Sequence, residues 1–65
     1  MMSISDQSLK ISWDIYTYYN DDKTPTDNDY KKIDKISESL IYDHIVGNVD
    51  IFKYDDDMFY DLIFN

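Results

Sequence analysis

His44 is the single histidine of this 65-residue chain and the first residue to consider for acid–base catalysis. A Ser–His–Asp arrangement would need a serine held on a rigid elbow, but no G-x-S-x-G motif is present and Gly47 is the only glycine. Phosphate-binding loops need several glycines, and catalysis by a thiolate needs cysteine, which the chain lacks. We therefore expect no enzyme activity. We expect His44 to be partly buried in the last turn of a helix, where the dipole favours its charged form.

Three consecutive aspartates, Asp55, Asp56 and Asp57, could supply oxygen ligands to calcium or magnesium. However, neither aspartate-rich stretch has the alternating acids, the glycine and the terminal glutamate of an EF-hand loop. Hydrolysis by paired carboxylates would need one of them to be desolvated, and so small a domain offers little concavity. We expect no metal site and no cofactor. The simpler alternatives are that these acids face water, or that they protect an adjacent aggregation-prone strand.

The charge of the chain restricts its partners. Fourteen acids, thirteen of them aspartate, face six lysines, which gives a net charge of −8. Direct binding of DNA, RNA or an anionic membrane needs a basic surface, so we expect none of these partners. Disorder is disfavoured, because 43% of the residues are hydrophobic and eleven are aromatic. No apolar stretch is long enough to span a membrane and no signal peptide is recognisable in "MMSISDQSLK", so we expect a cytoplasmic protein.

The chain is long enough for one domain, residues 1–65, with a small core. A β-strand is expected in "SLKISWDIYTYYN", residues 8–20, because apolar residues alternate with polar ones. These apolar residues are Leu9, Ile11, Trp13 and Ile15. We expect Trp13 in the core. A helix with Leu9, Trp13 and Tyr16 on one face is the poorer alternative, because Ile11 and Ile15 would leave that face.

An amphipathic helix is expected after the polar connection "NDDKTPTDND". Thr26 or Asp27 can cap its first turn, and the helix should end near Val46 with Gly47 in the left-handed conformation. Its apolar residues recur at three- and four-residue intervals: Tyr30, Ile33, Ile36, Leu40 and Ile41.

Beyond Gly47, "VDIFKY" indicates a second strand, "DDD" a turn and "MFYDLIFN" a returning strand. The expected fold class is therefore α+β, a small β-α-β-β domain with a short antiparallel sheet and one helix packed on a face. The last segment also admits a helix, because Met58 with Leu62 and Phe59 with Ile63 fit one helical face.

The mixture of aspartates and tyrosines indicates a surface for binding protein. Acids one helical turn apart, or on one face of a strand, lie about 5–7 Å from one another, which is the scale of phosphate spacing in nucleic acid. Tyrosine is enriched in protein interfaces, so Tyr16, Tyr18, Tyr19, Tyr54 and Tyr60 offer surfaces suited to protein contact. The expected contact acids are Asp55, Asp56, Asp57 and Asp61, with Asp21 and Asp22 as a second patch. The expected aromatic anchors are Tyr54, Phe59 and Tyr60.

In length, charge and its mixing of Asp with Tyr and Phe, as in "YDDDMFYD", the chain resembles the small acidic inhibitors of phages and mobile elements. These include anti-CRISPR proteins and inhibitors of uracil-DNA glycosylase. The resemblance is one of overall character and assigns no residue a role. It implies an inhibitor, monomeric or homodimeric, that blocks the DNA or RNA site of a basic host enzyme by mimicry. A CRISPR effector is the favoured target and uracil-DNA glycosylase the next. The alternative is a structural adaptor that pairs an exposed strand edge with a partner.

Overall fold

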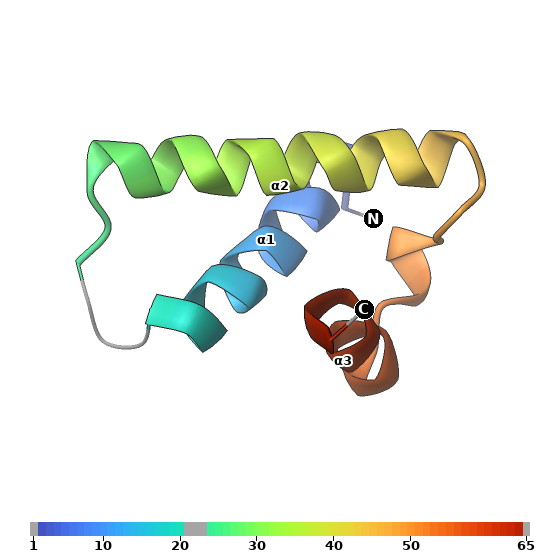
Figure 1. Ribbon diagram of the computed structural model, residues 1–65. Helices are drawn as coiled ribbons and strands as arrows, with labels where there is room; N and C mark the ends of the chain where they lie inside the picture. The colour runs from blue at the N-terminus through green and yellow to red at the C-terminus, as the bar shows by residue number, and fades with distance from the viewer. Residues whose placement is uncertain (1, 21–23, 65) are drawn as a thin grey trace.

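The computed structural model describes residues 2–20 and 24–64, which form a helical fold (Figure 1). Helix α1 (Ile4–Asn20) crosses beneath the longer α2 (Asp27–Ile45). A short 3₁₀ helix, η1 (Ile51–Lys53), leads into α3 (Asp56–Phe64), and both lie on the same side of α2 as α1. Since the described residues contain no strand, the predicted α+β fold and its β-α-β-β order are wrong.

Helix α1 occupies the segment that was expected to be a strand. Its buried face combines Ser8, Ile11, Ser12 and Tyr16, which recur at helical spacing, and Ile15 packs against the same core. The alternating pattern misleads because it assigns both serines to solvent. Their hydroxyl groups instead donate to backbone carbonyls, Ser8 Oγ to Ser5 at 2.8 Å and Ser12 Oγ to Ser8 at 2.7 Å. Hydrogen bonding of this kind removes the main cost of burying a hydroxyl.

Helix α2 confirms the predicted helix and both of its ends. Thr26 is the N-cap of a capping box: its hydroxyl accepts from the Asp29 N–H, and the Asp29 carboxylate accepts from the Thr26 N–H. Val46 is the C-cap, and Gly47 follows with a φ of 87°, a left-handed conformation that glycine adopts without steric cost. His44 lies half-buried in the last turn, as predicted.

Helix α3 replaces the predicted turn and final strand. Asp55 caps this helix, because its Oδ1 accepts a hydrogen bond from the Met58 backbone at 2.9 Å. Asp56 and Asp57 then occupy the first turn, where the helix dipole favours negative charge. Met58 and Leu62, one turn apart, pack on the core. The helical alternative for this segment is therefore the correct one.

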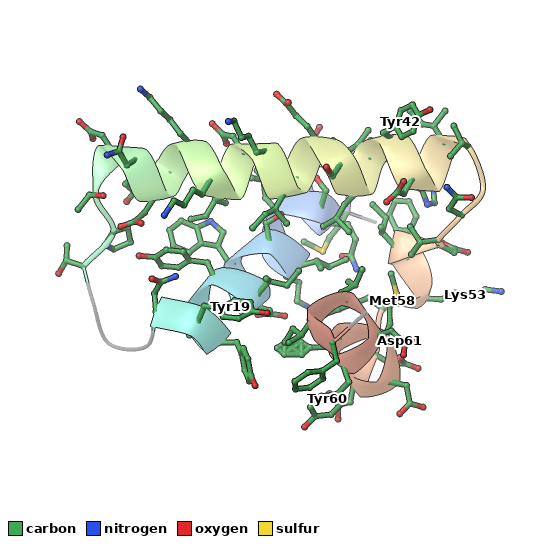
Figure 2. The ribbon with its side chains drawn as sticks, in the orientation of Figure 1. Tyr19, Tyr42, Lys53, Met58, Tyr60 and Asp61 are labelled. Atoms are coloured by element: carbon green, nitrogen blue, oxygen red, sulfur yellow. The ribbon has the colours of Figure 1, made fainter. Side chains whose placement is uncertain are left out.

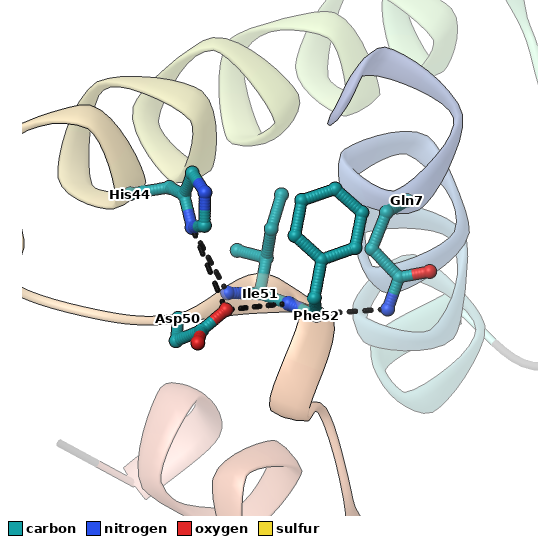
Figure 3. Close-up of polar contacts among 5 residues, drawn as sticks. All are labelled: Gln7, His44, Asp50, Ile51 and Phe52. Carbon is teal, nitrogen blue, oxygen red and sulfur yellow. Dashed lines mark hydrogen bonds and ion pairs between the residues drawn. The ribbon is translucent and has the colours of Figure 1, made fainter. Parts of the chain in front are cut away.

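The main hydrophobic cluster takes one buried residue from each of three elements: Ile11 of α1, Leu40 of α2 and Ile51 of η1. The backbone of Ile51 is held by side chains from both long helices (Figure 3). Its N–H donates to His44 Nδ1 at 3.3 Å, and its carbonyl accepts from Gln7 Nε2 at 2.8 Å. Asp50 accepts from the Phe52 backbone at 3.0 Å and so closes the turn. Side chains thus supply the hydrogen bonds that this short buried segment cannot make for itself.

The prediction that Trp13 belongs to the core is wrong, because Trp13 is half-buried and lies outside the main hydrophobic cluster. Its ring packs edge-on against Tyr16 and Tyr30, with centroids 5.6 and 5.7 Å away. Tyr16 is buried beneath it. Burial, together with the charge of Asp29, raises the pKa of the Tyr16 phenol above its usual value.

Candidate functional site

Five aromatic side chains from α1 and α3 form a continuous patch, which we call the aromatic cluster: Tyr18, Tyr19, Phe59, Tyr60 and Phe64. The Tyr18 ring lies 5.9 Å from Phe59 and 6.3 Å from Phe64, in edge-to-face contact with both. Tyr60 stacks on Phe64 at 6.1 Å. Tyr19 contacts Tyr18 at 5.1 Å, and its hydroxyl reaches the carbonyl of Ile63 at 3.4 Å.

The aromatic cluster is largely exposed to solvent. Tyr18, Tyr19, Tyr60 and Phe64 keep between 50% and 67% of their surface accessible. Helix α3 packs the partly buried Met58 and Leu62 against the core, and its Tyr60 and Phe64 are exposed. Figure 2 shows Tyr19 at the end of α1 and Tyr60 on α3, both on the side of the molecule away from α2. Contiguous exposed apolar patches are often interaction sites, so the aromatic cluster is a candidate for one.

A groove of about 430 Å³ lies beside the aromatic cluster, where α1 meets the start of α3. Its lining comprises two acids, one threonine and three rings: Asp14, Asp56, Thr17, Tyr18, Tyr54 and Phe59. No lysine lines it. The groove therefore offers negative charge and aromatic faces together.

Tyr54 anchors one wall of this groove. Its hydroxyl donates a hydrogen bond to Asp14 Oδ2 at 2.9 Å, which ties the segment before α3 to α1. Burial, then the hydrogen bond to Asp14 and its charge, and finally the charge of Asp56 raise the pKa of the Tyr54 phenol well above its usual value. The groove thus holds two carboxylates near one hydroxyl, with no lysine in its lining.

The structure brings some of the predicted contact residues together and separates others. Tyr54, Phe59 and Asp56 line the groove, and Tyr60 lies in the aromatic cluster next to them. Asp55 is partly committed to capping α3. Asp57 and Asp61 do not line the groove; they lie one turn apart on α3, and Asp57 is also one turn before Tyr60 on the helix surface. Asp21 and Asp22 lie outside the described residues.

Sequence reasoning placed Tyr18 and Tyr19 among the tyrosines suited to protein contact, but it did not select Asp14, Thr17 or Phe64. The expected strand placed Asp14 on a polar face with no relation to the end of the chain. A helical interpretation of "DIYTYYN" would have found part of the site, because Asp14 and Tyr18 are then one turn apart on the same face.

Two other surface features are less well defined chemically. Tyr42, Ile45 and Val46 are exposed at the end of α2, and Figure 2 shows Tyr42 pointing away from the other helices. A second groove of about 350 Å³ is mainly apolar and includes Leu40 and Leu62. Among the described residues, no cluster of three or more metal-binding side chains occurs, and no helix has the length and apolarity needed to cross a membrane.

Comparison with known proteins adds no relative: no protein family, no curated protein and no solved structure matches the chain. Function must therefore be inferred from the fold and from the surface that α1 and α3 form.

Proposed function

We propose that this protein inhibits a nucleic-acid enzyme by binding the basic surface that otherwise holds DNA or RNA. The proposal is based on one observation: the exposed rings of the aromatic cluster lie on and beside the most acidic part of the chain. The segment from Asp50 to Phe64 has five aspartates and one lysine, which is half of the net charge of −8. Its helix α3 also supplies three of the five rings of the aromatic cluster.

The charge on α3 supports attraction to a basic partner. Helix α3 contains three acids, Asp56, Asp57 and Asp61, and no base. Helix α2, in contrast, mixes five acids with three lysines on its longer surface. Complementary charge accelerates association and selects a basic partner over others. The α3 side is therefore the face that meets the partner.

The aromatic cluster supports a protein partner rather than a small ligand. Exposed tyrosines supply large contact areas at low cost in side-chain entropy, and aromatic residues dominate the binding energy of many interfaces. Acids alone would give fast but weak and salt-sensitive binding. Acids around Tyr18, Tyr60 and Phe64 combine electrostatic attraction with apolar contact area that salt does not weaken.

The class of target follows from the resemblance to acidic phage inhibitors. We propose a host enzyme in the cytoplasm, with a CRISPR effector ahead of uracil-DNA glycosylase, bound by a protein encoded by a phage or mobile element. Direct binding of nucleic acid is disfavoured by the charge. The adaptor alternative fails in its stated form, because it needs an exposed strand edge and the described residues contain no strand.

A competition experiment tests the proposal. The protein is immobilised, exposed to nuclease-treated lysate of bacteria that carry CRISPR systems, and eluted by a salt step. Each captured protein is then purified and bound to labelled DNA or RNA, and the inhibitor is added. We expect a basic protein that elutes early in the salt step and loses its nucleic acid as the inhibitor is added.

Two matched variants sharpen this experiment. Asp56→Asn, Asp57→Asn and Asp61→Asn together remove three charges from α3 and leave the capping Asp55 in place. Asp34→Asn, Glu38→Gln and Asp43→Asn remove three charges from α2. Only the α3 variant should lose most of its ability to displace nucleic acid. Equal loss in the two variants, or captured proteins that keep their nucleic acid, would contradict the proposal.

A further inference from the structure

We infer that the groove lined by Asp14, Tyr18, Tyr54, Asp56 and Phe59 binds an arginine side chain of the protein partner. This inference rests on the proposed function and specifies the chemistry by which the partner is recognised. The guanidinium group would lie against the Tyr18 and Phe59 rings, with the carboxylates of Asp14 and Asp56 as its hydrogen-bond acceptors.

The lining of the groove matches a cation better than any other ligand. Its two charged residues are both acids, and no lysine reaches it. Its three aromatic residues offer π faces, which attract cations through the ring quadrupole. A phosphate or carboxylate would meet two like charges there. An uncharged apolar side chain would take water away from both carboxylates and offer them no hydrogen bond in return, which is costly.

Arginine fits the groove better than lysine does. Its planar guanidinium group can stack on a ring and, at the same time, direct N–H groups to two carboxylates on different sides. The ammonium group of lysine is compact and strongly hydrated, and it gains less from a flat aromatic wall. The lining acids come from separate helices, Asp14 from α1 and Asp56 from α3, so a forked donor suits their arrangement.

The groove is held open by contacts that exist without a ligand. The Tyr54 hydroxyl is bonded to Asp14 Oδ2 at 2.9 Å, which restrains this carboxylate beside the groove. Tyr18 and Phe59 meet edge-to-face, with an interplanar angle of 81°. A ligand would therefore find the rings and one of the carboxylates already placed, which lowers the entropy cost of binding.

A peptide titration tests the inference. The probe is acetyl-Gly-Arg-Gly-amide, and the comparison peptides carry lysine or citrulline, the uncharged analogue of arginine. Each is added to ¹⁵N-labelled protein, and amide chemical shifts are recorded. We expect the arginine peptide to shift the amides of Asp14, Tyr18 and Asp56 in a saturable way. The lysine peptide should bind more weakly, and the citrulline peptide should cause almost no change.

Two variants of the groove and two matched controls accompany the titration. Asp56→Asn should weaken arginine binding by about fivefold, the upper end of what an exposed ion pair contributes. Tyr18→Leu, which lies on a different helix and keeps apolar volume, should weaken it similarly. The controls are Asp34→Asn and Tyr42→Leu on α2, away from the groove, and they should leave binding unchanged. Unchanged backbone shifts elsewhere show that each variant is folded.

The outcomes separate this inference from the proposed function. Equal shifts with arginine and citrulline, or equal weakening by Asp56→Asn and Asp34→Asn, would overturn the arginine site. If the inhibitor still displaces nucleic acid when it carries Tyr18→Leu and Asp56→Asn together, the proposed function stands and the groove is not its recognition site. If the groove binds arginine but no captured protein loses its nucleic acid, the arginine site stands and the proposed function fails.

Discussion

At the scale of single residues, two buried hydroxyl groups form a hydrogen bond between α1 and α2. Ser8 and Ser37 are both buried, and their Oγ atoms lie 2.6 Å apart across the two helices. Because the Ser8 hydroxyl has one hydrogen and donates it to the Ser5 carbonyl, Ser37 must be the donor to Ser8. Two hydrogen bonds therefore run in one direction: Ser37 donates to Ser8, and Ser8 donates to the backbone of α1.

Replacing Ser8 should therefore lower the free energy of unfolding more than replacing an exposed serine does. Ser8→Ala leaves the buried Ser37 hydroxyl without its acceptor, and we expect the free energy of unfolding to fall by about 1–2 kcal/mol. The double variant Ser8→Ala, Ser37→Ala should be less destabilised than the sum of the two single variants, by about 1 kcal/mol. Urea unfolding followed by circular dichroism measures both. Ser5→Ala, exposed on α1, controls for helix propensity, and strictly additive effects would show that the pair is not coupled.

The hydrogen bonds of these serines also limited what could be predicted from the sequence. A serine in a polar-apolar alternation looks solvent-facing, since nothing in the residue type shows that a carbonyl one turn earlier will accept its hydrogen. Once Ser8 and Ser12 are allowed inside, Ile11, Ile15 and Tyr16 fall on one helical face. The strand prediction for residues 8–20 fails for this reason.

At the scale of elements, capping residues at both ends make α2 the best-defined helix. The Asp29 carboxylate accepts hydrogen bonds from the Thr26 backbone at 2.9 Å and the Thr26 hydroxyl at 3.0 Å. The backbone bond is the main cause, followed by the hydroxyl bond, of a pKa for Asp29 below its ordinary value of 3.8. The folded protein therefore holds this proton less tightly than the unfolded chain does.

This shift predicts how Asp29 contributes to stability as the pH changes. A carboxyl group whose pKa is lower in the folded state stabilises fully above its ordinary value, and it loses that contribution as the pH falls through the folded pKa. Asp29→Asn should thus lower the melting temperature at pH 7, and the difference from the natural protein should shrink below about pH 4. Thermal unfolding at a series of pH values measures this difference. Asp34→Asn, exposed on the same helix, should show no such convergence; a constant deficit for Asp29→Asn at all pH values would contradict the role of its charge.

Helices α1 and α3 illustrate the opposite case, in which tertiary packing decides the secondary structure and the polar-apolar pattern of the sequence does not. A nine-residue helix such as α3 is too short to be stable alone, and it depends on Met58 and Leu62 packing against the core. Its aromatic and β-branched residues suit a strand as well as a helix. The cap provided by Asp55 and the burial of Met58 and Leu62 one turn apart select the helix.

At the scale of the whole molecule, the net charge of −8 on 65 residues should make stability and binding respond to salt in opposite directions. Repulsion among the acids destabilises the compact state, and salt screens it. We expect the melting temperature to rise between low salt and about 0.5 M NaCl, by about 4–8 °C for each 1 kcal/mol of repulsion removed. Over the same range, binding to the basic partner should weaken.

The variant that lacks the three α3 charges provides the comparison for this prediction. With Asp56→Asn, Asp57→Asn and Asp61→Asn, less repulsion remains, so the rise in melting temperature with salt should be smaller. Differential scanning calorimetry in NaCl and KCl measures the rise. If the melting temperature of the natural protein does not change with salt concentration, repulsion among its acids does not affect its stability.

The sequence by itself determined the features that depend on neighbouring residues or on composition. The helix from Asp27 to Ile45 could be predicted, because Thr26 and Gly47 act on the backbone directly beside them. The acidity and the lack of cysteine could be read directly. Only the tertiary structure decided that residues 8–20 are helical and that Asp14 of α1 lies beside Tyr54 and Asp56. Such placements depend on how helices distant in the chain pack against one another, and the residues of one segment do not show that packing.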